Sequence, residues 1–235
     1  MGTTARTGPN PSETRKARTR YDRIARVYDL LNWVGERFRY RQWRPLLWER
    51  VPAGRVLEVG IGTGANGPYY PEGVGVLGLD LSWRMLVQAA ERPAPQAGRP
   101  PTLVQMDAQA LGFGDETFDA AVGTFVFCSV PDPLEGLVEA RRALKPGGRL
   151  LLLEHVRSQR PVVGRLMDWL NPIAVRAMGV NINRETVKAV RRAGFRITED
   201  RPLGADGIFR LIEAIRPDPE VPEGPTRPEP GEVIR

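Results

Sequence analysis

Short apolar runs alternate with helical stretches through the middle of the chain, and this alternation limits the fold more than any other feature. The apolar runs read RVLEVG, VGVLGLDL, TLVQMD, FDAAVGTFVF and RLLLLEHV. Helical stretches lie between them, including WRMLVQAAER, which Ser82 can cap, and PLEGLVEARRAL. Strands that are apolar throughout are buried on both faces. The pattern therefore predicts an α/β fold of three layers, with a mainly parallel sheet covered by helices on both faces.

The loop after the first predicted strand reads LEVGIGTGANG and fits two ligand-binding templates. Gly62, Gly64 and Gly67 have the G-x-G-x-x-G spacing of dinucleotide-binding loops. Glu58, by contrast, is followed by glycines at alternate positions from Gly60 onward. Because the loop follows a strand and precedes a helix, it lies where open α/β sheets bind ligands. Both NAD and S-adenosyl-L-methionine suit such a place.

Three carboxylates, each at the end of a predicted strand, separate these two ligands. Asp80 can accept both hydroxyl hydrogens of a ribose, which both ligands contain. Glu58 would repel a pyrophosphate but attract a sulfonium cation and an α-amino group. Asp107 can accept from the exocyclic amine of an adenine. The set favours S-adenosyl-L-methionine as cofactor, with an NAD-dependent oxidoreductase and a non-catalytic adenosyl-binding module as the alternatives.

Four motifs in this order, VLEVGIGTG, LGLDLSWRML, MDAQALGFGDETFDAAV and LKPGGRLLLLEHV, resemble those of the class I S-adenosylmethionine-dependent methyltransferases. The resemblance spans about residues 20–215. It implies a methyltransferase with a Rossmann-like, seven-stranded, mostly parallel sheet whose last strand, IFRLIEAI, is antiparallel. It also implies cofactor contacts along the strand ends: Glu58, Gly60, Gly62 and Gly64 at the methionine end, Asp80 at the ribose, Leu81 and Met85 beside the adenine, Asp107 and Ala108 at the adenine amine, and Thr124 and Phe125 along the pocket.

Two tyrosines and a histidine are further candidates. Tyr21 and Tyr28 are seven residues apart on one face of a predicted helix, and in related enzymes such a YD-x-x-A-x-x-YD stretch closes over the cofactor. His155 follows the fifth apolar run and could face the methyl acceptor as a base, or it could be a structural hydrogen-bonding group. We therefore name Tyr28 and His155 as catalytic candidates. The single cysteine, Cys128, and the single histidine predict no disulfide within the chain and no metal site.

The acceptor is the least determined part of the prediction. The segments FDAAVGTFVFCSVPDP, LLLEHVRS and NINRETVKAVRRAGF look most like the bacterial phosphatidylethanolamine N-methyltransferases and the related lipophilic thiol methyltransferases. Ubiquinone/menaquinone C-methyltransferases are next, although the aromatic-proline segment expected after the fifth strand is missing. The resemblance implies a small lipophilic acceptor or a phospholipid head group, with phosphatidylethanolamine N-methylation favoured. C-, O- or S-methylation of a quinone, ring or thiol is the alternative.

Basic and aromatic residues are concentrated near the N-terminus. Residues 1–50 contain twelve Arg or Lys and five Asp or Glu, whereas the whole chain has a net charge of +6. Arginines interleaved with tryptophans on an amphipathic helix predict contact with an anionic membrane surface through residues 20–50, unless the aromatics simply pack over the sheet. Nucleic acid is disfavoured because no binding module accompanies the basic residues. The candidates for acceptor or membrane contact are Trp33, Arg37, Arg39, Arg41, Trp43, Met167 and Leu170.

The domain organisation follows from composition. Residues 1–19 lack periodic apolar residues and predict a disordered basic arm, and the Pro/Glu-rich residues 216–235 predict a disordered tail. Residues 20–215 form one predicted domain, which includes N-terminal amphipathic helices over 20–51 and a substrate-cap insertion over 156–194. With neither a secretory signal nor an apolar run that could cross a bilayer, we expect a cytoplasmic protein, peripheral at the inner face of the membrane.

Overall fold

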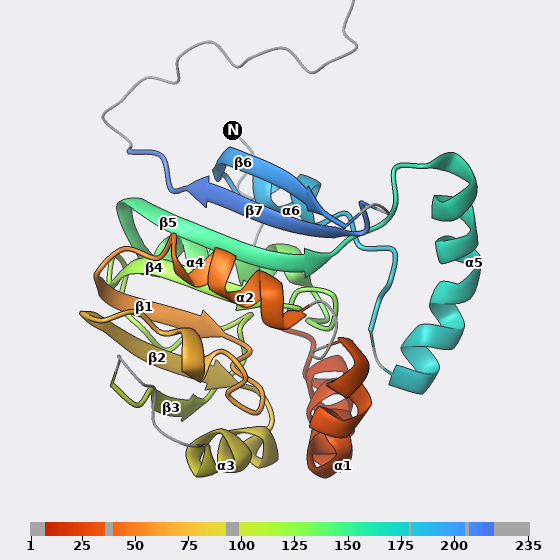
Figure 1. The fold of residues 1–235 in the computed structure, drawn as a ribbon, viewed down its shortest axis with the longest axis horizontal. Coiled ribbons are helices and arrows are strands. Elements are labelled where there is room, and N and C mark those ends of the chain that lie inside the picture. The colour runs from red at the N-terminus through yellow and green to blue at the C-terminus, as the bar shows by residue number, and fades with distance from the viewer. Residues whose placement is uncertain (1–7, 36–39, 93–98, 179, 205–206, 219–235) are drawn as a thin grey trace, which may run out of the picture.

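A computed structural model describes residues 8–35, 40–92, 99–178, 180–204 and 207–218. They form one seven-stranded sheet in the order β3-β2-β1-β4-β5-β7-β6, drawn in Figure 1. Only β7 is antiparallel to its neighbours, β5 and β6. The predicted α/β fold, with an antiparallel last strand, is confirmed. The strands are β1 (Gly54–Val59), β2 (Val74–Asp80), β3 (Thr102–Gln105), β4 (Phe118–Thr124), β5 (Leu144–His155), β6 (Arg196–Leu203) and β7 (Phe209–Ile215).

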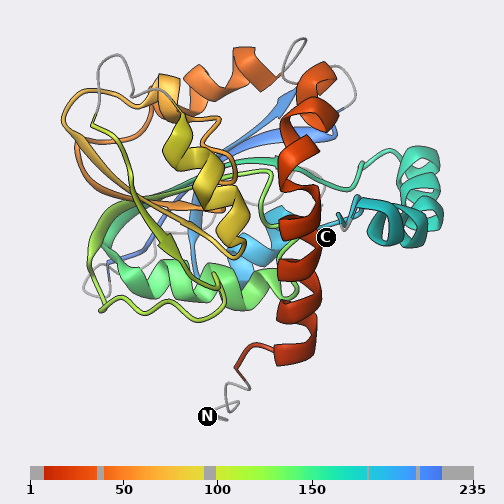
Figure 2. The same ribbon diagram turned by 90° about the horizontal axis from the view of Figure 1, so that it is seen from below.

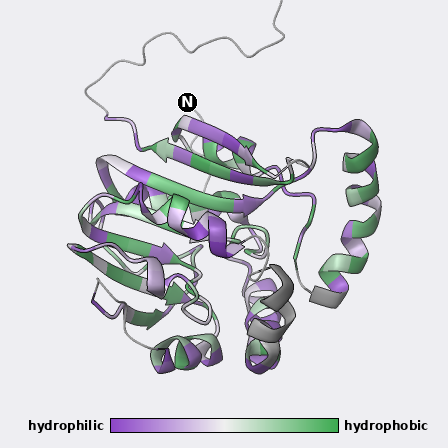
Figure 3. Cartoon of the chain, viewed as in Figure 1, coloured by the Kyte–Doolittle hydropathy of each residue, from purple (hydrophilic) through white to green (hydrophobic). Residues whose placement is uncertain are grey.

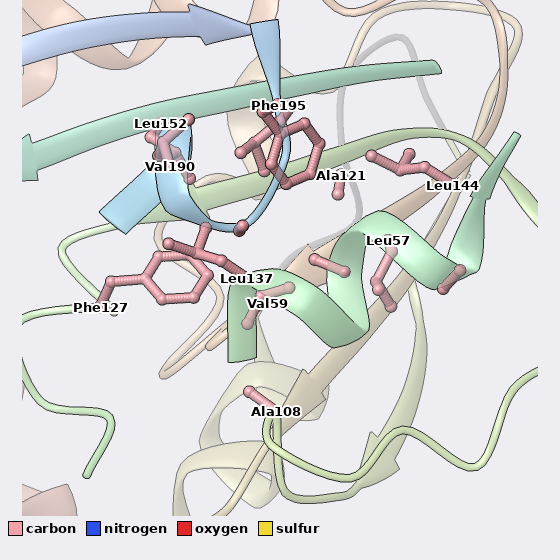
Figure 4. Packing of buried hydrophobic residues seen from close by; sticks show 14 of the residues in the cluster. Leu57, Val59, Ala108, Ala121, Phe127, Leu137, Leu144, Leu152, Val190 and Phe195 are labelled. Atoms are coloured by element: carbon pink, nitrogen blue, oxygen red, sulfur yellow. The ribbon is translucent and has the colours of Figure 1, made fainter. Parts of the chain in front are cut away.

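Helices cover both faces of the sheet because alternate strand residues point to opposite sides. On β5, Leu150 and Leu152 pack with α4 and α6, whereas Leu151 and Leu153 pack on the other face with α2. Figure 4 shows the first of these clusters around α4, and Figure 3 shows the apolar character of the central strands. The helices are α1 (Pro11–Gly35), α2 (Arg41–Trp48), the 3-10 turn η2 (Gly67–Tyr69), α3 (Trp83–Glu91), α4 (Pro133–Ala143), α5 (Pro161–Met178) and α6 (Thr186–Arg192).

Helix α1 begins within the segment predicted to be a disordered arm, so that part of the prediction was wrong. The side chain of Asn10 accepts a hydrogen bond from the backbone N–H of Ser12 at 3.0 Å, and Pro11 occupies the first turn, where its missing N–H costs nothing. The turns that follow are held by tertiary contacts, with Ala17 buried. The arm was misjudged because one small apolar residue and polar contacts fix it, and neither produces a periodic apolar pattern.

Helix α1 crosses the carboxyl ends of the strands, as Figure 2 shows from below. Its Asp22 accepts a hydrogen bond of 2.6 Å from the hydroxyl of Ser82, the residue that also caps α3. Helix α5 lies within the predicted insertion over 156–194 and stands at one end of the molecule (Figure 1). None of the helices that the structure describes is long and apolar enough to cross a bilayer.

Candidate active site

A pocket runs along the carboxyl ends of β3, β2, β1 and β4, which are neighbours in the sheet. Helix α1 covers it from outside. In open α/β sheets this edge is the usual place for ligands. The structure brings together eleven of the residues named from the sequence, which are Tyr21, Tyr28, Gly60, Gly62, Asp80, Leu81, Met85, Asp107, Ala108, Thr124 and Phe125.

Asp80 lies at the middle of the pocket and is held by the backbone. The N–H of Gly62 donates to its Oδ2 at 3.0 Å, and the N–H of Ser82 donates to its Oδ1 at 2.8 Å. Burial raises the pKa of Asp80 to about 6, although these two hydrogen bonds oppose the shift. Each carboxylate oxygen has further lone pairs, so the group can still accept from a pair of ribose hydroxyls.

Asp107 lies at the β3 end of the pocket and connects it to α1. The hydroxyl of Thr14 donates to Asp107 Oδ2 at 2.8 Å. The backbone N–H of Gln109 donates to Oδ1 at 2.9 Å, and the Gln109 amide also contacts the carboxylate. The carboxylate predicted to meet the adenine amine is therefore also the attachment point of the first turns of α1.

Glu58 lies behind the pocket instead of lining it. Its side chain is buried and accepts hydrogen bonds from the Asn66 amide, at 2.7 Å, and from the Tyr70 hydroxyl. Burial raises the pKa of Glu58 to about 7. The same Asn66 amide donates to the Thr124 hydroxyl, which lines the pocket, at 3.1 Å. Glu58 thus shapes the loop through Asn66, and its predicted contact with the cofactor stays a prediction.

The glycines of the loop have different tasks. Gly62 has a φ of +56°, and the space where a Cβ would stand meets only the Gly60 carbonyl oxygen, 4.0 Å away, so this position is open to a ligand. Gly64, with φ at +78°, does not line the pocket. A Cβ there would come 3.2 Å from the backbone of Ala89, so Gly64 allows α3 to pack closely.

Tyr21 and Tyr28 reach the pocket from α1, with ring centroids 6.4 Å apart in an edge-on arrangement. Burial raises the pKa of the Tyr21 hydroxyl far above its ordinary value, and this hydroxyl is hydrogen-bonded to Ser129. Ala17 lines the pocket one turn earlier, and sequence reasoning missed it. Extending the Tyr21–Tyr28 face back by four residues would have found it.

An aromatic cluster adjoins the β4 end of the pocket. Phe125 lines the pocket at a φ of +55°, and its ring lies 4.4 Å from that of Tyr40 and 6.0 Å from that of Phe209. Trp43 packs on Phe209 at 5.1 Å and is only 9% exposed, so the predicted membrane contact of Trp43 was wrong. His155 also packs edge-on against Phe209, at 5.3 Å, and does not line the pocket.

Glu154 is a second site residue that sequence reasoning missed. It is fully buried, and its Oε1 accepts from the backbone N–H groups of Val126 and Phe127, both at 2.9 Å. Burial raises the pKa of Glu154 to about 7. This carboxyl fixes the loop that carries Phe125 and Val126 along the pocket. A glutamate inside the apolar run RLLLLEHV was the signal that could have pointed to it.

The remaining candidates for acceptor or membrane contact are spread over several environments. Arg41 is exposed on α2. On α5, Met167 is buried and Leu170 is half-buried. Arg37, Arg39 and the side chain of Trp33 lie outside the part of the chain that the structure describes. The structure therefore does not gather these residues into one site.

Comparison with known proteins decides the class of this pocket. Residues 57–152 match the model of a methyltransferase domain. The chain is 32% identical over 171 residues to a phosphatidylethanolamine N-methyltransferase of Cereibacter sphaeroides, covering 68% of this chain and 78% of that one. It is 34% identical over 170 residues to a demethylmenaquinone methyltransferase of Renibacterium salmoninarum, covering 71% and 68%. The chain belongs to the S-adenosylmethionine-dependent methyltransferases.

The fold of this methyltransferase agrees with that assignment. A solved S-adenosylmethionine-dependent methyltransferase of Thermotoga maritima superimposes with a TM-score of 0.65 at 24% identity, covering 84% of this chain and 99% of that one. That likeness concerns the fold alone. The methyltransferase class and its cofactor, both expected from the sequence motifs, are confirmed.

The pocket of the methyltransferase fits S-adenosyl-L-methionine. Two carboxylates stand along one wall, Leu81 and Met85 provide apolar surface beside them, and the space at Gly62 is open. Asp80 would hold the ribose and Asp107 the adenine amine. The bound cofactor supplies a methyl group on a sulfonium centre. The task of the chain is to hold the acceptor in line with that group and to exclude water, which explains why the pocket needs no nucleophile of its own.

Proposed function

We propose that this methyltransferase transfers methyl groups to the amine nitrogen of phosphatidylethanolamine. The observation that carries the proposal is the aromatic wall at the β4 end of the pocket. Tyr28 and Phe125 line the pocket itself, and Tyr40 and Phe209 stand behind Phe125. Aromatic faces attract ammonium groups, and a substrate amine and its methylated products are such groups. The likeness to a phosphatidylethanolamine N-methyltransferase supports the same acceptor.

C-methylation of a quinol ring is the second candidate, which the likeness to demethylmenaquinone methyltransferases favours. Attack by a ring carbon needs the phenolate form, and a base held against the ring would have to produce it. His155, the only histidine of the chain, packs on Phe209 and does not line the pocket. An ammonium group must likewise lose its proton to solvent before the nitrogen can attack, so the preference for the amine rests on the aromatic wall and not on a base.

The test separates the two acceptors in detergent. The purified chain is incubated with tritiated S-adenosyl-L-methionine and detergent-dispersed phosphatidylethanolamine, its N-monomethyl form, or a demethylated quinol. We expect label in both amine lipids and none in the quinol. Label in the quinol alone would establish the second candidate in place of the first. An Asp80→Asn variant, which should not hold the cofactor, sets the background.

A further inference from the structure

Helix α5 presents an unusual amount of apolar surface to solvent. Its buried side carries Met167 and Ala174, each 7% exposed. The outward residues are spaced by four, three and four, and because a helix has about 3.6 residues per turn they fall in one line. We call them the α5 stripe: Val162 at 80% exposure, Leu166 at 50%, Trp169 at 72% and Ile173 at 60%.

Single exposed apolar residues are ordinary on protein surfaces, but a contiguous line of them marks a contact site. The stripe makes up most of the large apolar residues exposed in the described part of the chain. Figure 3 shows the apolar colour extending along α5 at the outer end of the molecule. The remaining question is which partner covers this line.

A basic groove lies beside the C-terminal end of α5. Of the cations that line this groove, only Lys16 has an ion-pair partner among the residues that the structure describes. Its Nζ lies 2.8 Å from Oε1 of Glu13. The arginines of the groove therefore carry charge that nothing in the described chain neutralises. The groove is lined by Arg15, Lys16, Thr19, Arg20, Arg23 and Ile24 of α1 and by Arg176 of α5.

The stripe and the groove belong to one surface. Arg176 lines the groove and follows Ile173 by three residues on α5, so the two side chains are neighbours along that helix. Arg165, which is exposed, borders the stripe further along. Figure 1 shows the C-terminal end of α5 turned towards α1. We propose that the α5 stripe and the groove arginines together dock the methyltransferase on an anionic lipid bilayer.

A bilayer matches both halves of this surface. Its phosphates would neutralise Arg20, Arg23 and Arg176, and its acyl region would receive Trp169 and Ile173, as with other amphipathic helices that lie in the interface. A second copy of the chain would bring the same arginines face to face and would be repelled. A nucleic acid would match the arginines but would leave the stripe in water. The docking surface does not depend on which lipid is methylated.

The first experiment tests the stripe. The full chain is floated with vesicles of phosphatidylcholine alone or mixed with phosphatidylglycerol. We expect binding to the anionic vesicles, and at least about tenfold weaker binding for Leu166→Gln/Trp169→Gln/Ile173→Gln. Since these side chains are exposed, the variant should keep the fold, which circular dichroism checks. Trp83→Gln removes another exposed tryptophan, 60% exposed on α3, and is expected to bind as the wild type does.

The second experiment tests the groove. Arg20→Gln/Arg23→Gln should weaken binding to the anionic vesicles about twenty-five-fold, at roughly fivefold for each arginine. The matched control, Arg192→Gln/Arg196→Gln, removes two exposed arginines from α6 and β6 and should change little. High salt should also reduce binding of the wild type, because the attraction is screened.

Three results would overturn the docking proposal. In the first, the wild type binds neither kind of vesicle. In the second, all variants bind as strongly as the wild type does. In the third, the wild type is a dimer that binds no vesicles, and only the stripe variant is a monomer. The last of these would assign the stripe to self-association. Methylation of detergent-dispersed phosphatidylethanolamine should be unchanged in the stripe and groove variants. If the wild type binds vesicles but does not methylate that lipid, the proposed acceptor fails while the docking surface stands.

Discussion

The strand-end loops and the two outer helices, α1 and α5, are held in place by different means. The loops are fixed by buried carboxyl groups. Glu58 accepts hydrogen bonds from Asn66 and Tyr70, and Glu154 accepts them from two backbone N–H groups. The outer helices depend on more exposed polar contacts, such as Thr14 to Asp107 and Arg157 to Asp168. The comparison indicates rigid strand-end loops and more adaptable outer helices. The predictions below test that contrast.

The largest effect should follow a change among the strand-end loops, at Asp80. Replacing Asp80 by Asn removes the charge that is predicted to accept two ribose hydroxyls, and hydrogen bonds to a charged group are the strong ones. We expect the affinity for S-adenosyl-L-methionine, measured by titration calorimetry, to fall at least about a hundredfold. Asp119→Asn is the control, because Asp119 lies at the start of β4 and bonds to Lys145 and to the N–H of Arg55. Equal affinities would remove Asp80 from the site.

The buried carboxyl group of Glu154, which holds one of the loops, should make the free energy of unfolding depend on pH. Burial raises the pKa of Glu154 from its ordinary value, 4.5, to about 7. Below pH 4.5 the carboxyl is protonated whether the chain is folded or not. As the pH rises towards 7 and above, the unfolded state gains by ionising before the folded state does, so stability is lost.

The variant Glu154→Gln should lack that loss. Between about pH 5 and pH 8 we expect the unfolding free energy of the wild type to fall by roughly 2–3 kcal/mol more than that of the variant, measured by urea unfolding. An exposed glutamate changed in the same way, Glu72→Gln, should follow the wild type. Parallel curves for the wild type and Glu154→Gln would contradict a protonated carboxyl behind the loop.

A smaller effect should follow on the outer side, where α1 is attached. Thr14→Val removes the hydrogen bond from Thr14 to Asp107 while keeping the size of the side chain. We expect amide hydrogen exchange in the first turns of α1 to rise by about fivefold to tenfold, with little change elsewhere. Thr19→Val, on an exposed face of the same helix, should leave exchange unchanged. Equal exchange in both variants would mean that other contacts hold α1.

The smallest effect on stability should come from breaking the exposed ion pair between Arg157 and Asp168. Nη2 of Arg157 lies 2.8 Å from Oδ2 of Asp168, and both side chains are partly exposed to solvent. Exposed pairs of this kind contribute little to stability. Asp168→Asn should therefore leave the melting temperature within the error of the measurement. A clear drop would show that α5 depends on this pair and is less adaptable than we infer.

Local pattern was sufficient for the strand-end loops and for the face of α1 that lines the pocket. The strand runs, the glycine loop and the carboxylates at the strand ends follow from periodicity and spacing, and the Tyr21–Tyr28 face follows from helical repetition. Glu154 escaped because a carboxylate in an apolar run is explained only by the N–H groups of Val126 and Phe127, which come from another strand end.

The positions of residues on α2 and α5 depend more on contacts between distant segments. Whether Trp43 faces lipid or the core is decided by Phe209, which lies far along the chain. The period of α5 predicts an apolar line but not which side of the helix meets the domain. Leu166 and Ile173, which lie within the predicted substrate cap over 156–194, are exposed, while Met167 is buried.

The backbone angle of Phe125 has a consequence for changing the pocket. A bulky residue at a φ of +55° carries a strain of about 1–3 kcal/mol, which glycine would avoid. Phe125→Gly would therefore remove the ring from the β4 end of the pocket while relieving the backbone, which makes this position a natural starting point for engineering the pocket.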